Sequence, residues 1–248
     1  MSDDIDITFD FRADTPAGKD PDTWSPTLRQ YHKFLWGRPL PSGHSFELDD
    51  SAPSTRRYLY HYSALGEFFL GSDSVIPTYT RWVRMQPIVN QFSEQENEAF
   101  RAIGYTIGGM MVWPGRSIDG QRSINVERGF NAKIADRMDL TLECVRRYYR
   151  GEASPMTPVL DSNADFFRLF GGFHGFVEHF LLQDLLTEDG GSVDFIMPFN
   201  DFVGRSTPGD VETYKAYREK TISFINARNR RIQDLARQLA DSEEVRNE

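Results

Sequence analysis

Apolar and polar residues alternate over residues 5–11, and this period of two is typical of a β-strand. Residues 57–62, 74–82 and 193–199 are further strand candidates, rich in aromatic and β-branched residues. Residues 105–113 are apolar almost throughout, as in a buried strand, and an Asp-Gly turn at 119–120 separates them from a strand pattern over 122–126. The sequence therefore predicts an antiparallel hairpin over residues 105–126. Adjacent glycines at 108 and 109 indicate a bulge or a close approach by another part of the chain.

Apolar residues recur every three to four positions in other segments, which is the period of an amphipathic helix. The predicted helices cover residues 26–36, a short segment that ends at 69, 93–103, 131–150, 157–170, 175–186 and 209–239. Ser25 precedes Pro26 as an N-cap residue, and Ser93 and Glu96 have the spacing of a capping box. Two helix starts are therefore marked by their capping residues.

These patterns predict a single α+β domain over residues 1–248. Its sheet is mixed but mainly antiparallel, is built on the central 105–126 hairpin, and is covered by aromatic-rich helices from the second half of the chain. Residues 1–25 are expected to form an acidic strand and loop, and residues 209–248 a long C-terminal helix with a frayed tail. The 19 Phe, 10 Tyr and 4 Trp indicate that aromatic rings fill much of the core.

The formal net charge of −9 counts against nonspecific binding to nucleic acid, because such binding needs a basic surface. The N-terminus is acidic where a signal peptide is basic, and no apolar stretch approaches the ~20 residues of a membrane helix. A lone Cys144 permits no internal disulfide. We therefore expect a cytoplasmic protein without a membrane partner. The cofactor and the oligomeric state stay open.

The strongest candidate for a binding site is the segment between residues 108 and 137, which is rich in glycine and arginine. A hairpin that presents several guanidinium groups beside free backbone amides suits a phosphate or carboxylate group. The predicted ligand-binding residues are Arg116, Arg122, Ser123, Asn125, Arg128 and Asn131. The alternative is that the arginines form structural ion pairs, such as Arg128 with Asp136, and that the glycines only permit a turn.

Two residues are candidates for catalysis. His61 lies between tyrosines in a predicted strand, where it can serve as a general base or as a partner for a stacked nucleotide. Asp119 lies in the turn of the predicted hairpin. The competing interpretation of His61 is structural, because strand histidines surrounded by aromatic residues are usually packed and satisfied.

Two further clusters favour structural interpretations. His174, Glu178 and His179 share a predicted helix, but their spacing matches no known zinc motif and two ligands make a weak site, so no metal is predicted. The basic run at 228–231 is balanced by acidic neighbours, which favours a solvated helix face over an RNA-binding patch. The sequence also lacks the Walker-A, G-x-G-x-x-G, G-x-S-x-G, H-E-x-x-H and paired C-x-x-C motifs.

Several segments carry a resemblance to a known group of proteins. They include Phe9-Asp10-Phe11-Arg12, Ile103-Gly104-Tyr105-Thr106-Ile107-Gly108-Gly109-Met110, Arg128-Gly129-Phe130-Asn131, Asp139-Leu140-Thr141-Leu142-Glu143-Cys144 and Pro198-Phe199-Asn200-Asp201-Phe202. In these segments the chain resembles an uncharacterised bacterial protein family that carries a domain of unknown function. The resemblance implies that most of the chain is one unit, and it implies no activity, cofactor or catalytic residue.

The sequence thus predicts an intracellular protein that binds a phosphate-bearing ligand, either a nucleotide or a nucleic acid, and it leaves open whether the protein is an enzyme. The alternative is a noncatalytic ligand-binding or protein-interaction module. A concave pocket in which Arg116 or Arg128 meets a titratable group favours the enzyme. A convex, salt-bridged hairpin favours the alternative.

Overall fold

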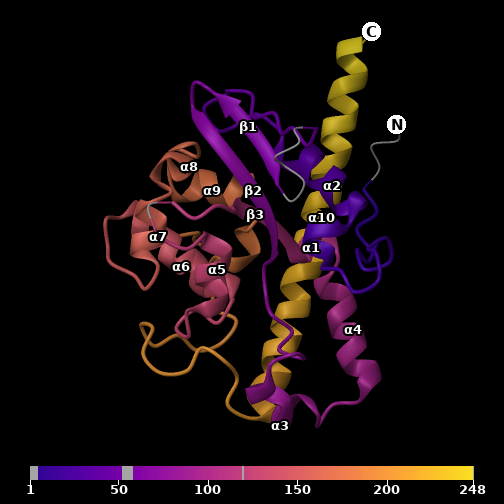
Figure 1. Ribbon diagram of the computed structural model, residues 1–248, viewed down its shortest axis with the longest axis vertical. Helices are drawn as coiled ribbons and strands as arrows, with labels where there is room; N and C mark the ends of the chain where they lie inside the picture. Colours follow the sequence, from indigo (N-terminus) through magenta and orange to yellow (C-terminus); the bar gives the residue numbers. More distant parts are fainter. Residues whose placement is uncertain (1–4, 52–57, 119, 248) are drawn as a thin grey trace.

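A three-stranded antiparallel sheet and a long C-terminal helix cross near the middle of the molecule (Figure 1). The computed structural model describes residues 5–51, 58–118 and 120–247. The strands are β1 (Leu59–Ser63), β2 (Gly66–Ser74) and β3 (Met110–Pro114), in the spatial order β1, β2, β3. Ser63 pairs with Gly66, and Leu70 pairs with Pro114. The α+β class and the antiparallel sheet are therefore confirmed.

Helices surround the sheet. They are α1 (Pro21–Trp24), α2 (Pro26–Trp36), α3 (Gln86–Val89), α4 (Glu94–Gly104), α5 (Ile124–Phe130), α6 (Met138–Tyr149), α7 (Thr157–Asp161), α8 (Ala164–Arg168), α9 (Phe173–His179) and α10 (Val211–Asn247), with the 3-10 turns η2 (Val83–Met85), η3 (Ile107–Gly109) and η4 (Gln183–Leu185). Helix α10 contacts α3, α4, η3 and η4. In Figure 1, α5 to α9 gather on one side of α10 and α4 lies on the other. None of the helices in the described ranges combines the length and the apolar character needed to cross a membrane.

The two capped helix starts follow the sequence closely. Ser25 accepts the backbone N–H of Leu28 at 3.1 Å, with Pro26 at the first helical position of α2. At α4, Ser93 accepts the N–H of Glu96 at 3.2 Å, and the Glu96 carboxylate accepts the N–H of Ser93 at 2.8 Å. Each cap satisfies backbone donors that a helix leaves without internal partners, so these boundaries were predictable.

Aromatic side chains fill much of the core, as predicted. All five residues of β3 are buried, and the buried apolar residues form one contiguous cluster. Around α8 and α9 the ring centroids of Phe170, Phe176 and Phe180 are 5.0 to 5.3 Å apart, in tilted or edge-to-face arrangements. This geometry suits the quadrupoles of the rings as well as burying their surface.

Helix α10 presses directly against η3. A Cβ atom on Gly108 would lie 2.6 Å from the side-chain oxygen of Asn229 and 2.6 Å from the Ile225 carbonyl oxygen. The close approach expected from the paired glycines is therefore confirmed. Arg228, in the basic run interpreted as a solvated face, is instead fully buried and donates to the carbonyl oxygens of Gly108 and Met110 at 2.8 Å each.

The predicted 105–126 hairpin is wrong. Strand β3 pairs with β2, and the sheet's hairpin joins β1 to β2 through a turn in which Gly66 has φ 137°. Residues 122–126 lead into helix α5, because the Ser123 side chain accepts the N–H of Val126 and acts as an N-cap. Strand β2 replaces the helix predicted to end at 69, and of the strand predicted over 74–82 only Ser74 lies in a strand.

Other boundaries also differ from the predictions. Residues 5–11 form turns in place of a strand, because Asp6 and Asp10 side chains accept backbone N–H groups two residues ahead. Helix α6 starts at Met138, since positive φ angles at Ala135 and Asp136 prevent an earlier start. The strand predicted over 193–199 is reduced to one bridge between Val193 and Leu186. Helix α10 continues past residue 239 to Asn247.

Candidate ligand-binding cleft

The three arginines of the predicted phosphate clamp lie apart. Arg128 is fully buried and pairs with Asp73 and, at 3.5 Å, with Asp136. Its guanidinium also donates to the Thr141 hydroxyl at 3.1 Å and to the carbonyl oxygens of Ser74 at 3.1 Å, Val75 at 3.3 Å and Asp136 at 2.9 Å. Such a saturated donor holds β2 to the 128–136 segment and has no hydrogen left for a ligand.

Arg116 and Arg122 lie on the surface, in different surroundings. The Arg116 guanidinium lies over the Phe69 ring, with its central carbon 3.1 Å from the ring centroid. Arg122 faces Glu127 at 3.8 Å and the exposed ring of Phe130 at 5.4 Å. Since neither group faces buried Arg128, the arginines do not converge on one anion.

The polar residues of the predicted clamp support the backbone. Ser123 caps α5, and the Asn125 side chain donates to the Ser72 carbonyl oxygen at 3.2 Å. Asn131 donates to Glu127 at 2.9 Å and to the Pro155 carbonyl oxygen at 3.3 Å. Asp119, the second catalytic candidate, lies outside the described residues.

His61 is buried in the middle of β1, next to the rings of Phe46 and Phe68. Its Nδ1 lies 2.9 Å from the Glu47 carbonyl oxygen, so Nδ1 carries the proton and Nε2 accepts from the Ser63 hydroxyl at 2.7 Å. An oriented histidine next to a hydroxyl is the geometry of an activated serine. Ser63 also accepts the N–H of Leu65 at 3.1 Å, which gives it a structural role in the turn.

Buried carboxyl groups surround Arg128. Burial raises the pKa of Asp73 well above its usual range, against the opposing effect of Arg128, and it raises the pKa of Asp136 in the same way. Burial, and then the charges of Asp20 and Asp136, raise the pKa of Asp22 to about 7. Asp22, Asp73 and Asp136 thus bring α1, β2 and the segment before α6 together around the Arg128 guanidinium. Within the described ranges, no three or more His, Cys, Asp and Glu side chains are grouped so that they could hold a metal ion.

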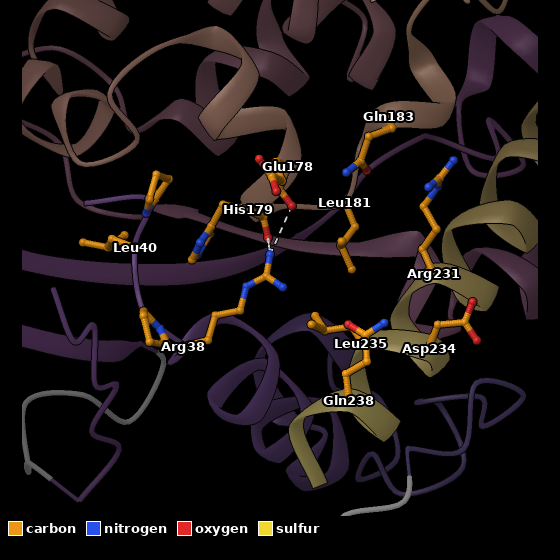
Figure 2. A pocket seen from close by; sticks show the side chains of 12 residues that line it. Arg38, Leu40, Glu178, His179, Leu181, Gln183, Arg231, Asp234, Leu235 and Gln238 are labelled. Atoms are coloured by element: carbon orange, nitrogen blue, oxygen red, sulfur yellow. Dashed lines mark hydrogen bonds between the residues drawn. The ribbon is translucent and has the colours of Figure 1, made fainter. Parts of the chain in front are cut away.

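A cleft of about 700 Å³ opens between the loop after α2, the end of α9 and α10 (Figure 2). Its walls are formed by Arg38, Pro39, Leu40, Pro41, Glu178, His179, Leu181, Gln183, Arg231, Asp234, Leu235 and Gln238. Arg231 is already neutralised by Asp184, with contacts of 2.6 and 3.0 Å that form a bidentate pair. Arg38 therefore supplies the cation of this cleft that is least compensated.

Arg38 is held by backbone rather than by a carboxylate. Its guanidinium donates to the carbonyl oxygens of Glu178, at 3.1 Å, and of His179, both at the C-terminal end of α9. Figure 2 shows the group between the His179 backbone and the side chains of Leu181 and Leu235. Burial lowers the pKa of Arg38, and the charge of Glu178 only partly opposes this effect. A partly buried cation thus faces the cleft, and no carboxylate of the described residues forms an ion pair with it.

His179 lies beside this cation. The ring is 3% exposed and packs against Trp36, Phe170 and Phe180. Burial, followed by the charge of Arg38, lowers its pKa to about 3, so the ring is neutral at physiological pH. Its Nε2 is buried and has no hydrogen-bond partner among the described residues.

None of the predicted catalytic or ligand-binding residues lines this cleft, although Glu178 and His179 had been considered as metal ligands. The walls come from segments near residues 38, 180 and 235, which are far apart in the sequence. In the sequence, Arg38 stands between Gly37 and Pro39, where it belongs to no hydrophobic repeat and to no known motif. The available signal was weak: a proline-rich loop directly after a well-defined helix often carries function.

A family model described as a family of unknown function, DUF6994, matches residues 5–232. The chain belongs to the DUF6994 family. No curated protein and no solved structure matches the chain. The DUF6994 match includes the loop that carries Arg38, the end of α9 and Arg231, whereas Asp234, Leu235 and Gln238 lie beyond its end. The part of the cleft around Arg38 and His179 therefore falls within the DUF6994 region.

Proposed function

We propose that this protein binds a small ligand with a phosphate or carboxylate group in the Arg38 cleft, and that it does so without catalysing a reaction. The observation that carries the proposal is the Arg38 guanidinium, which is partly buried, faces the cleft and has no carboxylate partner among the described residues. Burying a charge is costly unless an opposite charge compensates it, so an anion bound here would remove that cost.

The chemistry of Arg38 favours these anions. A guanidinium presents planar, forked N–H donors that match the paired oxygen atoms of a phosphate or carboxylate. Glu178 and Asp234 also line the cleft, and their charges would repel a polyanion such as a nucleic-acid strand. The cleft thus suits a small ligand with one anionic group.

Binding without catalysis follows from the other side chains. The cleft-lining residues of the described chain include no hydroxyl, thiol or amine nucleophile. A general base operates best with a pKa near the working pH, whereas the pKa of His179 is lowered to about 3. His179 therefore does not act as a proton carrier, and its buried ring forms part of the wall of the cleft.

The proposal is tested by calorimetry and thermal shift with inorganic phosphate, sugar phosphates and dicarboxylates, on the natural chain and on Arg38→Ala and Arg38→Lys. We expect a ligand at 100 times its Kd to stabilise the natural chain by ~2.7 kcal/mol. Arg38→Ala should lower the affinity at least tenfold. Arg38→Lys should keep part of the affinity, because lysine keeps the positive charge but lacks the forked N–H donors of a guanidinium.

Arg150→Ala is the matched control, because this exposed arginine pairs only with Glu152 among the described acids and lies outside the cleft. Circular dichroism of each variant separates lost binding from lost folding, since Arg38 also caps α9. Equal affinities of the natural chain and Arg38→Ala would contradict the proposal, as would an absence of binding across the whole panel.

A further inference from the structure

A second hollow, of about 330 Å³, lies between the ends of β2 and β3 and the link from α7 to α8. Its apolar wall includes Phe69, Pro114 and Phe166, and its polar wall includes Arg116, Ser162 and Asn163. It shares no lining residue with the Arg38 cleft. Any ligand bound here would therefore be recognised independently of that cleft.

The backbone fixes Arg116 over Phe69. The N–H of Gly115 donates to the Phe69 carbonyl oxygen at 2.8 Å, which continues the β2 and β3 pairing beyond Pro114. A Cβ atom on Gly115 would lie 2.4 Å from the Tyr58 ring and 3.2 Å from the Gly71 nitrogen, so only glycine allows this approach. The next residue, Arg116, is thereby placed with its guanidinium against the Phe69 ring.

Aromatic rings continue from this point along the hairpin. Tyr60 lies directly across from Phe69 in the strand register, and their ring centroids are 4.7 Å apart. Tyr58 meets the same Phe69 ring edge-on at 6.3 Å. Tyr62, two residues further along β1, is 75% exposed. One face of the hairpin therefore carries aromatic rings in tilted and edge-on contact, and the Arg116 guanidinium lies at the edge of the hollow.

We infer that this hollow binds a mononucleotide, with its base stacked on the Arg116 guanidinium and its phosphate held by the N–H donors of the same group. One face of the guanidinium lies against Phe69, and the exposed Arg116 side chain lines the hollow, where a planar base can stack on it. Stacking accepts any base, because every base has a π-face. The apolar side chains of Pro114 and Phe166 exclude water from the ring.

The charges around the hollow favour a single nucleotide over a nucleic-acid strand. Glu67 also lines the hollow and would repel the repeated phosphates of a strand, whereas Asp165 is paired with Arg168. Strand binding also depends on a basic groove that follows the backbone, whereas this chain carries a net charge of −9. Glu67 and Asp165 can instead accept hydrogen bonds from the amino group of a base such as adenine.

The test uses AMP as the probe, measured by calorimetry on the natural chain, Arg116→Ala, Arg38→Ala and the control Arg150→Ala. We expect Arg116→Ala to weaken AMP binding about tenfold or more, and we expect Arg38→Ala and Arg150→Ala to leave it unchanged. Arg116 is exposed, so its removal should not unfold the protein. The cleft and the hollow are thereby tested separately.

Adenosine and ribose 5-phosphate, titrated in the Arg38→Ala background so that the Arg38 cleft does not contribute, divide the contributions of base and phosphate. We expect each to bind more weakly than AMP and to lose affinity in Arg116→Ala. Unchanged AMP binding in Arg116→Ala would overturn the inference, and so would AMP binding that is lost in Arg38→Ala instead. The inference would also be overturned if a twelve-nucleotide oligoadenylate bound more tightly than AMP and with a strong dependence on salt. That result would favour a strand-binding surface.

Discussion

The side-chain oxygen of Asn229 accepts the backbone N–H of Gly108 at 2.6 Å, across 121 residues of sequence. This contact leaves no space for a side chain at Gly108. We therefore expect Gly108→Ala to lower the free energy of unfolding by about 1–3 kcal/mol, because backbone and a buried amide would both have to move. Urea denaturation measures the change.

Gly129→Ala is the matched control for this prediction. Gly129 lies in α5, and nothing lies within 4 Å of a Cβ atom placed there. Because alanine favours the helix over glycine, we expect an unchanged or slightly raised stability, by up to about 1 kcal/mol. Equal effects of the two substitutions would show that packing against Asn229 does not constrain Gly108.

Arg128 should behave as a structural residue. Its removal leaves Asp73 and Asp136 without their cation, and breaking a buried ion pair in this way costs about 3–5 kcal/mol. Arg122→Ala should change stability by no more than about 0.5 kcal/mol, because this arginine is exposed. Unfolding curves of the two variants measure the difference. An Arg128→Ala variant as stable as the natural chain would contradict this structural role.

The raised pKa of Asp22 predicts a pH dependence of stability. Between about pH 4 and pH 7 the folded protein keeps a proton on Asp22 that the unfolded chain has released, so this group's contribution falls as the pH rises. The lowered pKa values of His32 and His179, about 3 each, act in the opposite direction, since the unfolded chain takes up protons there as the pH falls below 6.5.

The difference between the natural chain and Asp22→Asn isolates the carboxyl group. We expect the variant to gain stability relative to the natural chain as the pH rises from 4 to 7, and the gain to level off above pH 7. Urea denaturation at several pH values measures it. A difference that is constant over this interval would contradict a raised pKa at Asp22.

A catalytic His61 requires a reactive Ser63, since the ring's Nε2 faces that hydroxyl at 2.7 Å. On that hypothesis a fluorophosphonate probe labels Ser63, and His61→Gln removes the label because the general base is lost. Peptide mass spectrometry locates the modification. Labelling that persists in His61→Gln, or no labelling of the natural chain, would leave His61 with its structural role at the turn.

Local signals in the sequence predicted local structure well. The caps at Ser25 and Ser93, the buried β3 and the glycines that face α10 each depend on neighbours within a few residues or on side-chain size. The hairpin prediction failed because residues 122–126 read equally well as a strand or as a helix start. Only the hydrogen bond from Val126 to the Ser123 side chain decides between them.

The candidate sites were less predictable for a physical reason. Arg38 becomes a candidate for ligand binding only because α9 and α10 form a cleft beside it. Arg128 is unavailable to a ligand only because it pairs with Asp73 and Asp136. Sequence spacing shows neither desolvation nor ion pairing between distant segments. Arg116 was predicted as a ligand-binding residue beside glycine. Its contact with Phe69 depends on the pairing of β2 with β3, and the predicted 105–126 hairpin did not include that pairing.

The buried guanidinium of Arg228 also bears on how the chain folds during synthesis. It donates to carbonyl oxygens of Gly108, Met110 and Phe180, so it joins the start of β3 to the end of α9 from a position near the C-terminus. While a ribosome is still making the first 220 residues, these carbonyl groups have no partner from α10. Because contacts over such long sequence separations form slowly, the central strand is expected to reach its final packing only after translation has passed Arg228.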